Sequence, residues 1–431
     1  MLKHSNAATN ILYILYIILM FVICIRYLPV ALENSYNGLL FPASINYNRL
    51  YVSGIVSIIL FLLIKKRYSK IKTVSDAIML LLVLLYFLPG IIICGVCETE
   101  KMYFVYYLTF LFFTIFFERA ICFSEKFLSQ KISIKHNLDN IFTILILIIA
   151  LFFIFFFDYS FSISKLIIAA TDVYGVRADA SDHHWFFFTL EQWSVYFGAI
   201  LITYSLKINR WKVALALIIC EIFFFTMQAN KIDIFVTIFA IILGCKNINT
   251  REIAFCSFFI LVIIFIECLF FDQGLIATNI FRRFSIVPNR ISTCYYDYFQ
   301  THSPDFLRSV FTRINYYILG ISSQYPNIAH TIGETYFYKG MGANTGMIAP
   351  GFYAYGNWGI LIESFCIVVF IKIINSVCKG INSISLKLVI AIIFTVLLIN
   401  LPFPLANLFK LSYVFLLVLS IFLFRQYLQK V

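Results

Sequence analysis

Residues 65–97 read KKRYSKIKTVSDAIMLLLVLLYFLPGIIICGVC, in which a basic cluster precedes an apolar run that holds no charge from 77 to 97. A run of about 20 apolar residues is long enough to cross a bilayer as a helix. Basic residues beside such a run are typical of its cytoplasmic end. The stretch therefore predicts one transmembrane helix and its direction.

The rest of the chain repeats this pattern. Of its 431 residues, 62% are hydrophobic and only 13% are charged, and the mean hydropathy is +0.92. This composition excludes a soluble globular protein and predicts an all-α polytopic integral membrane protein. No segment between the apolar runs is both long enough and apolar enough to form its own core. Residues 1–431 are therefore expected to form a single transmembrane domain.

Apolar runs bounded by charged or turn residues predict about 12 transmembrane helices. Some runs are short, which leaves roughly ten or eleven helices as an alternative. The predicted spans are 11–28, 51–64, 77–97, 102–117, 139–157, 191–206, 213–228, 232–245, 253–271, 351–374, 387–403 and 408–424.

Basic residues orient these helices. With the N-terminus inside, the inner segments contain 20 of the 33 Lys and Arg residues. Both termini are therefore expected in the cytoplasm, and the first span, which lacks a cleavage site, is interpreted as a signal anchor. The net charge of +12 then reflects topology and contact with anionic membrane lipids, and it gives no support to nucleic-acid binding.

Cys94 and Cys97 form a CxxC motif at the outer end of the third span. The other cysteines are scattered, mostly inside predicted spans, where they behave as small apolar residues. The favoured interpretation is that Cys94 and Cys97 have no chemical role, and a disulfide between them is the alternative. With no second pair and no histidine to complete a ligand set, the motif predicts no metal site.

Polarity is concentrated on the outer side, in a first large loop at 158–190 and a second at 272–350, which together hold four of the six histidines. The inner loops are short and basic and contain no glycine-rich phosphate loop. Chemistry on the outer face is therefore expected, and ATP-driven chemistry on the inner face is not.

The first outer loop carries Arg177 and then a DxxDHH cluster at 179–184. The guanidinium of Arg177 is suited to clamp an anion. The cluster has ligand types for a divalent cation, but its spacing matches no established metal pattern. A solvated loop is the favoured interpretation of the cluster.

The second outer loop begins with Arg282, Arg283 and Arg290, at the expected height of lipid phosphates. Arginine pairs with phosphate through two hydrogen bonds. Binding of a lipid-linked pyrophosphate and anchoring to lipid headgroups both explain these arginines. Next come aromatic and polar residues, a mixture that suits either a sugar site or an interfacial helix: Tyr295, Tyr296, Tyr298, Phe299, Gln300, His302 and Asp305.

Residues 328–359, IAHTIGETYFYKGMGANTGMIAPGFYAYGNWG, add glycines that permit tight turns and close backbone approach. His330 and Glu334 are candidates for proton transfer. For His330, however, the favoured interpretation is a structural role with its ring nitrogens hydrogen-bonded beneath the loop. Asn344 and Gly346 are expected to shape the loop.

Three acidic residues lie inside predicted spans, where contact of a carboxylate with lipid is costly. They are expected to face the helix bundle or a polar neighbour, and they are Glu221, Glu267 and Glu363.

These features resemble the O-antigen polymerases, also called oligosaccharide repeat-unit polymerases or Wzy-like proteins. The resemblance rests on the number of spans, on RRFSIVPNR followed by YYDYF at the start of the long outer loop, and on the exit from IAHTIGETY to YGNWGILIE. It covers the topology of the whole chain, but its motifs are confined to about 280–365. One departure is QANKID, where family members often carry an arginine turn and this chain has Lys231.

The resemblance implies a GT-C-like architecture in the bacterial inner membrane and a metal-independent glycosyltransferase without a cofactor. Such an enzyme transfers the growing glycan from undecaprenyl pyrophosphate to a new lipid-linked repeat unit at the periplasmic face, as a step of lipopolysaccharide biosynthesis. The implied partners are undecaprenyl-pyrophosphate-linked oligosaccharides and membrane lipids. A chain-length regulator is a further partner that the resemblance allows.

On this interpretation the leaving pyrophosphate needs positive charge, and the attacking hydroxyl needs a base or only positioning. His330, Glu334 and Arg290 are the catalytic candidates, with Asp297 or His302 as further bases. The candidates for binding pyrophosphate or glycan are Arg177, Lys231, Arg282, Arg283, Tyr295, Tyr296, His302, Tyr336 and Asn344. Residues 328–359 would form the floor of the site, because irregular backbone is tolerated at membrane depth where it lines a wet cavity.

Other classes remain open. An O-antigen ligase that acts on lipid A-core shares the late loop and the lipid-pyrophosphate donor, and the sequence separates it poorly from a polymerase. A lipid-linked oligosaccharide flippase is expected to show two similar halves and short loops, and a small-anion transporter is expected to carry charges in mid-span. The ligase is the second alternative, and transport of either kind is the third.

Overall fold

The computed structural model of the chain describes residues 2–27, 46–68, 71–96, 101–121, 138–156, 185–228, 231–246, 248–270, 276–308, 320, 322, 325, 328–339, 341–343, 346–400, 405 and 412–431. All regular structure in these residues is helical, and they contain no strand. The expected all-α class is confirmed for this part of the chain.

The helices of the first half are α1 (Leu2–Val22), η1 (Ile23–Tyr27), α3 (Tyr47–Leu63), η3 (Ile64–Tyr68), α4 (Val74–Leu82), η4 (Val83–Phe87), α5 (Leu88–Val96), α6 (Lys101–Ala120), α7 (Leu138–Phe156), α10 (Trp185–Lys207) and α11 (Trp211–Gln228). The helices of the second half are α12 (Lys231–Cys245), α13 (Thr250–Phe270), η5 (Ala277–Ile286), α14 (Val287–Thr301), η6 (Phe306–Arg308), α16 (Ile328–Tyr336), α17 (Ala349–Tyr355), η7 (Gly356–Trp358), α18 (Gly359–Val377), α19 (Ile384–Ile399) and α20 (Ser412–Leu428).

In the part of the chain that the structure describes, every predicted apolar run overlaps helical structure. Seven helices in the described residues are long and apolar enough to cross a membrane: Ala7–Arg26, Tyr47–Arg67, Val74–Val96, Met102–Ala120, Leu138–Phe155, Arg251–Phe270 and Ala349–Val377. Three shorter apolar helices span Asp233–Cys245, Ile384–Ile399 and Ser412–Leu428. The total of about 12 spans stays a prediction.

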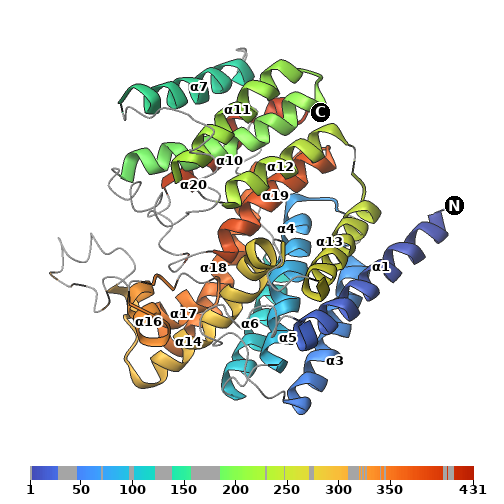
Figure 1. Cartoon of the computed structure of the whole chain (residues 1–431), viewed down its shortest axis with the longest axis vertical. Helices are drawn as coiled ribbons and strands as arrows, with labels where there is room; N and C mark the ends of the chain where they lie inside the picture. Colours follow the sequence, from blue (N-terminus) through green and yellow to red (C-terminus); the bar gives the residue numbers. More distant parts are fainter. Residues whose placement is uncertain are drawn as a thin grey trace.

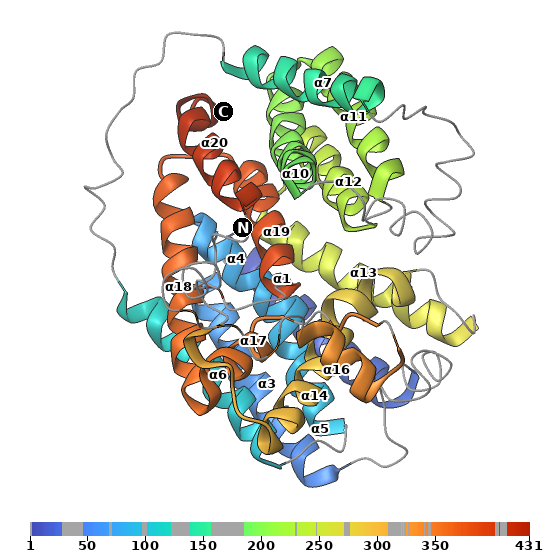
Figure 2. The same ribbon diagram turned by 90° about the vertical axis from the view of Figure 1, so that its left-hand side faces the viewer.

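The helices form two groups that share α18 and α19 (Figures 1 and 2). One group contains α7, α10, α11, α12 and α20, and the other contains α1, α3, α4, α5, α6 and α13. Helix α19 contacts α4, α10 and α12, while α18 contacts α4, α6 and α20. The two shared helices therefore hold the groups together as one bundle.

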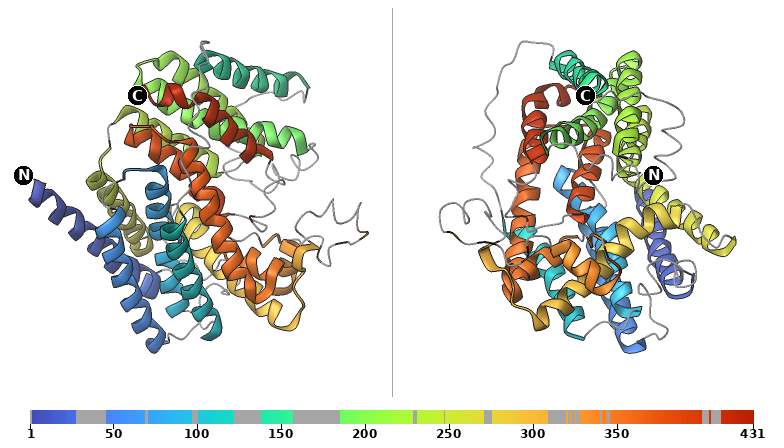
Figure 3. Two further views of the ribbon diagram at one scale, coloured as in Figure 1. Left: turned by 180° about the vertical axis from the view of Figure 1, so that it is seen from behind. Right: turned by 60° about the vertical axis from the view of Figure 1, so that its left-hand side comes forward.

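Both chain ends lie on one side of the bundle, here called the terminal side, and α14, α16 and α17 lie on the opposite side, here called the cap (Figures 1 and 3). The cap has its own small apolar core, to which α14, α16 and α17 contribute Ile291, Ile332 and Tyr353, among others. Much of the predicted second outer loop is therefore helical and packed.

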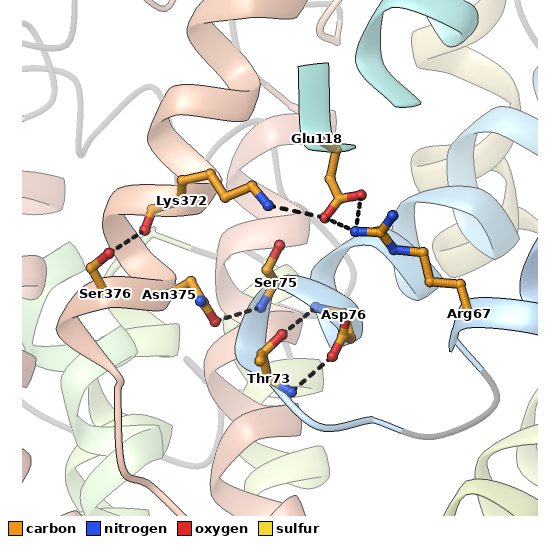
Figure 4. Close-up of polar contacts among 8 residues, drawn as sticks. All are labelled: Arg67, Thr73, Ser75, Asp76, Glu118, Lys372, Asn375 and Ser376. Carbon is orange, nitrogen blue, oxygen red and sulfur yellow. Dashed lines mark hydrogen bonds and ion pairs between the residues drawn. The ribbon is translucent and has the colours of Figure 1, made fainter. Parts of the chain in front are cut away.

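On the terminal side, a buried ion cluster ties three segments together (Figure 4). The carboxylate of Glu118, only 2% exposed, pairs with Arg67 Nη2 at 2.6 Å and with Lys372 Nζ at 3.1 Å. One helical turn away, the backbone N–H of Ser75 donates to Asn375 Oδ1 at 3.3 Å. These contacts fix the ends of η3, α4, α6 and α18 against one another.

Further hydrogen bonds join loop ends on this side. Lys387 Nζ donates to the carbonyl of Lys72 at 2.7 Å, and Ser385 Oγ donates to the carbonyl of Lys246 at 3.3 Å. All of these residues belong to segments that the charge pattern assigns to the inner side. The described inner segments therefore gather on one side, as alternating spans require, and the cytoplasmic identity of that side stays a prediction.

The acidic residues inside apolar helices are buried or have polar neighbours, as expected. Glu267 accepts hydrogen bonds from the backbone N–H groups of Ile276 and Ala277 at 2.8–3.0 Å. Glu363 is fully buried and accepts from the N–H of Leu405 at 2.8 Å. Glu221 is also buried, at 3% exposure.

Candidate functional site on the cap

The cap is joined to an interrupted apolar helix. The run α4–η4–α5 contains Pro89, which has no N–H to donate, and a π-helical turn precedes it. Tyr16 Oη donates to the carbonyl of Leu84 at 2.8 Å, and Ser285 Oγ donates to the carbonyl of Leu85 at 2.7 Å. Because a buried carbonyl without a partner is costly, these hydroxyls stabilise the interruption.

Asn289 connects the start of α14 to the same interruption. This side chain is 1% exposed, and its Nδ2 donates to the carbonyls of Tyr86 at 3.1 Å and Ser285 at 2.7 Å. Its Oδ1 accepts from Tyr107 Oη at 3.0 Å. A Cβ atom at Gly90 would collide with Tyr107 Oη and Asn289 Oδ1, so glycine provides the space. These contacts hold α14, and the arginine that follows Asn289, in a fixed register against α5 and α6.

One face of α14 carries charged and polar groups. Arg290, Cys294, Asp297 and Tyr298 recur at helical spacing and lie on the same face. Arg290 Nη1 donates to Thr293 Oγ1 at 3.2 Å. Burial raises the pKa of the Cys294 thiol to about 11, while the Arg290 charge acts in the opposite direction and the Asp297 charge in the same one. At neutral pH the thiol is therefore protonated and is no nucleophile.

Helix α16 adds a hydroxyl to this face. Tyr336 Oη donates to Asp297 Oδ2 at 2.6 Å, a charge-assisted hydrogen bond. Partial burial, followed by the hydrogen bond to Asp297, raises the pKa of Tyr336 above its usual value. The exposed carboxylate and the protonated phenol form a donor and acceptor pair of the kind that binds sugar hydroxyls.

Aromatic rings continue the face at the end of α14. The rings of Tyr298 and His302 stack at 3.9 Å with an angle of 6° between their planes. Thr301 Oγ1 lies 2.9 Å from His302 Nδ1. Phe299 and Tyr325 pack edge to face behind this pair, with ring centroids 5.6 Å apart. A partly exposed aromatic surface with polar edges can stack against a pyranose.

Tyr295 and Tyr296, two of the predicted glycan contacts, are buried at 1% and 3% exposure. Tyr295 Oη donates to the carbonyl of Ala343 at 3.0 Å. The Tyr296 ring packs against Tyr106 and Phe352, with centroids 5.4 and 5.3 Å away. In this structure Tyr295 packs in the cap core and Tyr296 packs in the main core of the bundle, while the neighbouring Tyr298 is only partly buried.

His330 and Glu334 are one helical turn apart on the exposed face of α16. The opposite face of α16 buries Ile328 and Ile332 in the cap core beside α14. The structure therefore brings the two predicted proton-transfer residues next to each other, but on the side of α16 that faces away from α14. Tyr336, a third candidate on α16, is hydrogen-bonded to Asp297 of α14.

The remaining candidates lie apart from this face or outside the described residues. Arg282 and Arg283 are half-buried in η5, which continues directly into α14. Lys231 is the first residue of α12, whose side chain there is not described. Arg177 and Asn344 fall outside the described residues, as does the DxxDHH cluster.

Two contributors were not identified as site residues from the sequence. Asn289 and Tyr107 form the buried polar contact that sets the position of α14. The available signal was a proline inside the third apolar run, because an interrupted helix needs polar partners from elsewhere in the chain.

No group of three or more His, Cys, Asp or Glu residues that could hold a metal ion occurs among the described residues. A surface hollow of about 530 Å³ lies on the terminal side, far from the cap, and is lined by Ala8, Ile11, Leu12, Asn249, Arg251, Glu252 and Phe255. Its position separates it from the polar face of α14.

Comparisons with protein-family models, curated proteins and solved structures found no match for this chain. The fold and the site define its class: an all-helical protein with helices long and apolar enough to cross a membrane, and a packed helical cap with a polar, aromatic face. The resemblance to O-antigen polymerases stays a prediction from the sequence.

Proposed function

We propose that the protein is an O-antigen or polysaccharide repeat-unit polymerase of the bacterial inner membrane. In this proposal about 12 helices span the membrane, both termini are cytoplasmic, and the cap is periplasmic. The enzyme transfers the growing glycan from undecaprenyl pyrophosphate to the non-reducing end of a new lipid-linked repeat unit.

The observation that supports this function best is the composition of one face of α14. Arg290, Asp297 and Tyr298 follow one another along this helix at the edge of the apolar bundle. Tyr336 of α16 is hydrogen-bonded to Asp297, and His302, the residue after α14, stacks on Tyr298. Such a face offers a cation for phosphate, a donor and acceptor pair for hydroxyls, and a ring surface for sugar. A lipid-linked pyrophosphate sugar requires all three.

The reaction needs little covalent chemistry from the protein. The acceptor hydroxyl attacks the anomeric carbon of the donor sugar, the bond from that carbon to the pyrophosphate oxygen breaks, and the hydroxyl proton passes to a carboxylate. Arg290 stabilises the charge of the leaving lipid pyrophosphate. Asp297 lies on the same helix face as Arg290 and is the preferred acceptor of the proton, ahead of Glu334 and His330.

The direct test is the lipopolysaccharide profile of the strain that carries the gene, with the gene deleted and then restored. A polymerase predicts that deletion reduces the ladder to core plus one repeat and that the wild-type gene restores it. Loss of every band above core would assign the chain to the ligase or the flippase alternative. An unchanged ladder would remove the glycan function altogether.

A further inference from the structure

Three buried carboxylic acids lie on three neighbouring helices far from the cap face. Glu191 on α10, Glu221 on α11 and Asp233 on α12 are each 2–3% exposed. These helices pack directly on one another. None of these acids takes part in the proposed transfer reaction.

Glu221 lies farther from the nearer end of its helix than the other two acids do. It lies seven residues before the end of α11, which corresponds to about 10 Å along the helix axis. Neither Oε1 nor Oε2 has a hydrogen-bond partner among the described residues. The carboxyl group presses against the backbone of α10, where a Cβ atom at Gly198 would collide with Oε1. Asp233 is close enough to act on Glu221 electrostatically.

The charged and titratable groups around Glu221 do not include a described cation within reach. Glu191 and Tyr196 lie on α10, and Asp233 lies on α12, whose first residue is Lys231. Asp233 also lies close enough to Tyr413 on α20 to act on it electrostatically. Helix α7 offers Asp139, which pairs with Arg210 at the terminal end of the bundle. On α11 itself, Lys212 is nine residues away, or about 14 Å along the axis.

An ionised carboxylate in an apolar interior without a cation or hydrogen-bond donors is strongly disfavoured. A second carboxylate nearby disfavours it further. We propose that Glu221, together with Asp233, forms a proton-binding site inside the α10–α11–α12 group. Glu221 carries the proton at neutral pH and lies against Gly198 in that form. The ligand of this site is a proton that enters from the end of the group where Glu191 and Asp233 lie.

Infrared spectroscopy of the purified full-length protein in nanodiscs tests this site, because the carbonyl stretch of a protonated carboxylic acid is separate from that of a carboxylate. At neutral pH, Glu221→Gln is expected to remove part of the protonated-acid band. Glu252→Gln is the matched control, because Glu252 is a more exposed carboxylate beside Lys246 at 3.6 Å. The control is expected to leave the band unchanged. An unchanged band in Glu221→Gln would overturn the proposal.

Thermal unfolding of the same samples provides a second criterion. A glutamine amide is neutral and has the shape of a protonated glutamic acid, so Glu221→Gln is expected to unfold within a few degrees of the wild type. Failure of this variant to fold would mean that Glu221 is ionised and paired, which contradicts the proposal. Spectra recorded in sodium salt and in choline salt distinguish a bound proton from a bound sodium ion. If the band of the protonated acid is lost only in sodium salt, the site binds a metal cation, and the proposal of a proton site is overturned.

Discussion

Asn289 donates a hydrogen bond from its side-chain amide to the backbone carbonyl of Tyr86 at 3.1 Å, across 203 positions of the chain. Tyr86 belongs to the π-helical turn before Pro89, and Asn289 precedes Arg290 at the start of α14. The interruption of an apolar helix and the placement of the polar face of the cap therefore depend on the same contact.

Asn289→Asp is expected to destabilise the protein by about 1–3 kcal/mol, because an aspartate can still accept from Tyr107 but cannot donate to the carbonyls of Tyr86 and Ser285. Thermal unfolding in nanodiscs measures the change. The same substitution at Asn357 is the control, because its exposed Oδ1 only accepts from Tyr106 Oη. Equal stability of both variants would show that the donated hydrogen bonds at Asn289 are not needed.

Gly90→Ala is expected to lower stability by about 1–3 kcal/mol, since the added methyl group overlaps Tyr107 and Asn289 in a packed interior. Gly54→Ala in α3 has nothing within 4 Å of the new Cβ. It is expected to be neutral or slightly stabilising, because alanine favours a helix over glycine. Urea or thermal unfolding of the pair measures the contrast, and a tolerated Gly90→Ala would refute the close approach of α14.

Glu118→Gln is expected to cost about 2–4 kcal/mol, because it leaves Arg67 and Lys372 beside a neutral amide in a largely buried cluster. Glu252→Gln breaks a more exposed pair with Lys246, whose side chain is 67% exposed. Its expected cost is below about 1 kcal/mol. If thermal unfolding gives the two variants the same stability, the ion cluster on the terminal side does not hold α6 and α18 together.

Tyr336→Phe is expected to loosen α16 from α14 by about 1 kcal/mol, a value reduced for the partial exposure of this pair. Hydrogen–deuterium exchange of residues 328–336 should accelerate in the variant. The raised pKa of Tyr336 also makes the stability of the protein depend on pH. As pH rises, the folded state keeps the phenol proton after the unfolded state has lost it. This tyrosine therefore lowers stability as pH rises above about 10, and the phenylalanine variant should lose that part of the alkaline destabilisation. Tyr51→Phe, at a 74% exposed tyrosine in α3, serves as the control.

Much of the helical architecture follows from the sequence. The lengths of the apolar runs predicted the helices. The basic residues beside these runs predicted which helix ends lie on the same side, and those ends meet around Glu118 and Lys372. The long polar segment was expected as a loop, but in the described residues much of it is helix, because residues such as Ile291 and Ile332 bury one side of α14 and α16. That packing depends on contacts between distant segments, which a single apolar run does not encode.

The candidate site was predictable only in part. Residue type identified the arginines and tyrosines, but not which tyrosine would be buried. Tyr295 and Tyr296 point into the core, whereas Tyr298 stacks with His302 nearer the surface. The rotation of α14 decides this, and Asn289 sets that rotation through a contact with a helix about 200 positions earlier. No local pattern around Asn289 contains this information.

The central claim is that the polar face of α14 elongates lipid-linked glycans. Its most direct test uses purified protein in nanodiscs, supplied with lipid-linked repeat units extracted from the deletion strain, with product length read on a gel. Wild-type protein should produce a ladder, and Arg290→Ala should reduce elongation by about 100-fold or more. The elongation activity of Arg290→Lys should fall between these two, because lysine keeps the positive charge but cannot bind phosphate through two parallel hydrogen bonds.

Arg251→Ala removes an exposed arginine on the terminal side and should retain the ladder. Failure of the wild-type protein to extend any repeat unit, or full elongation by Arg290→Ala, would contradict the account.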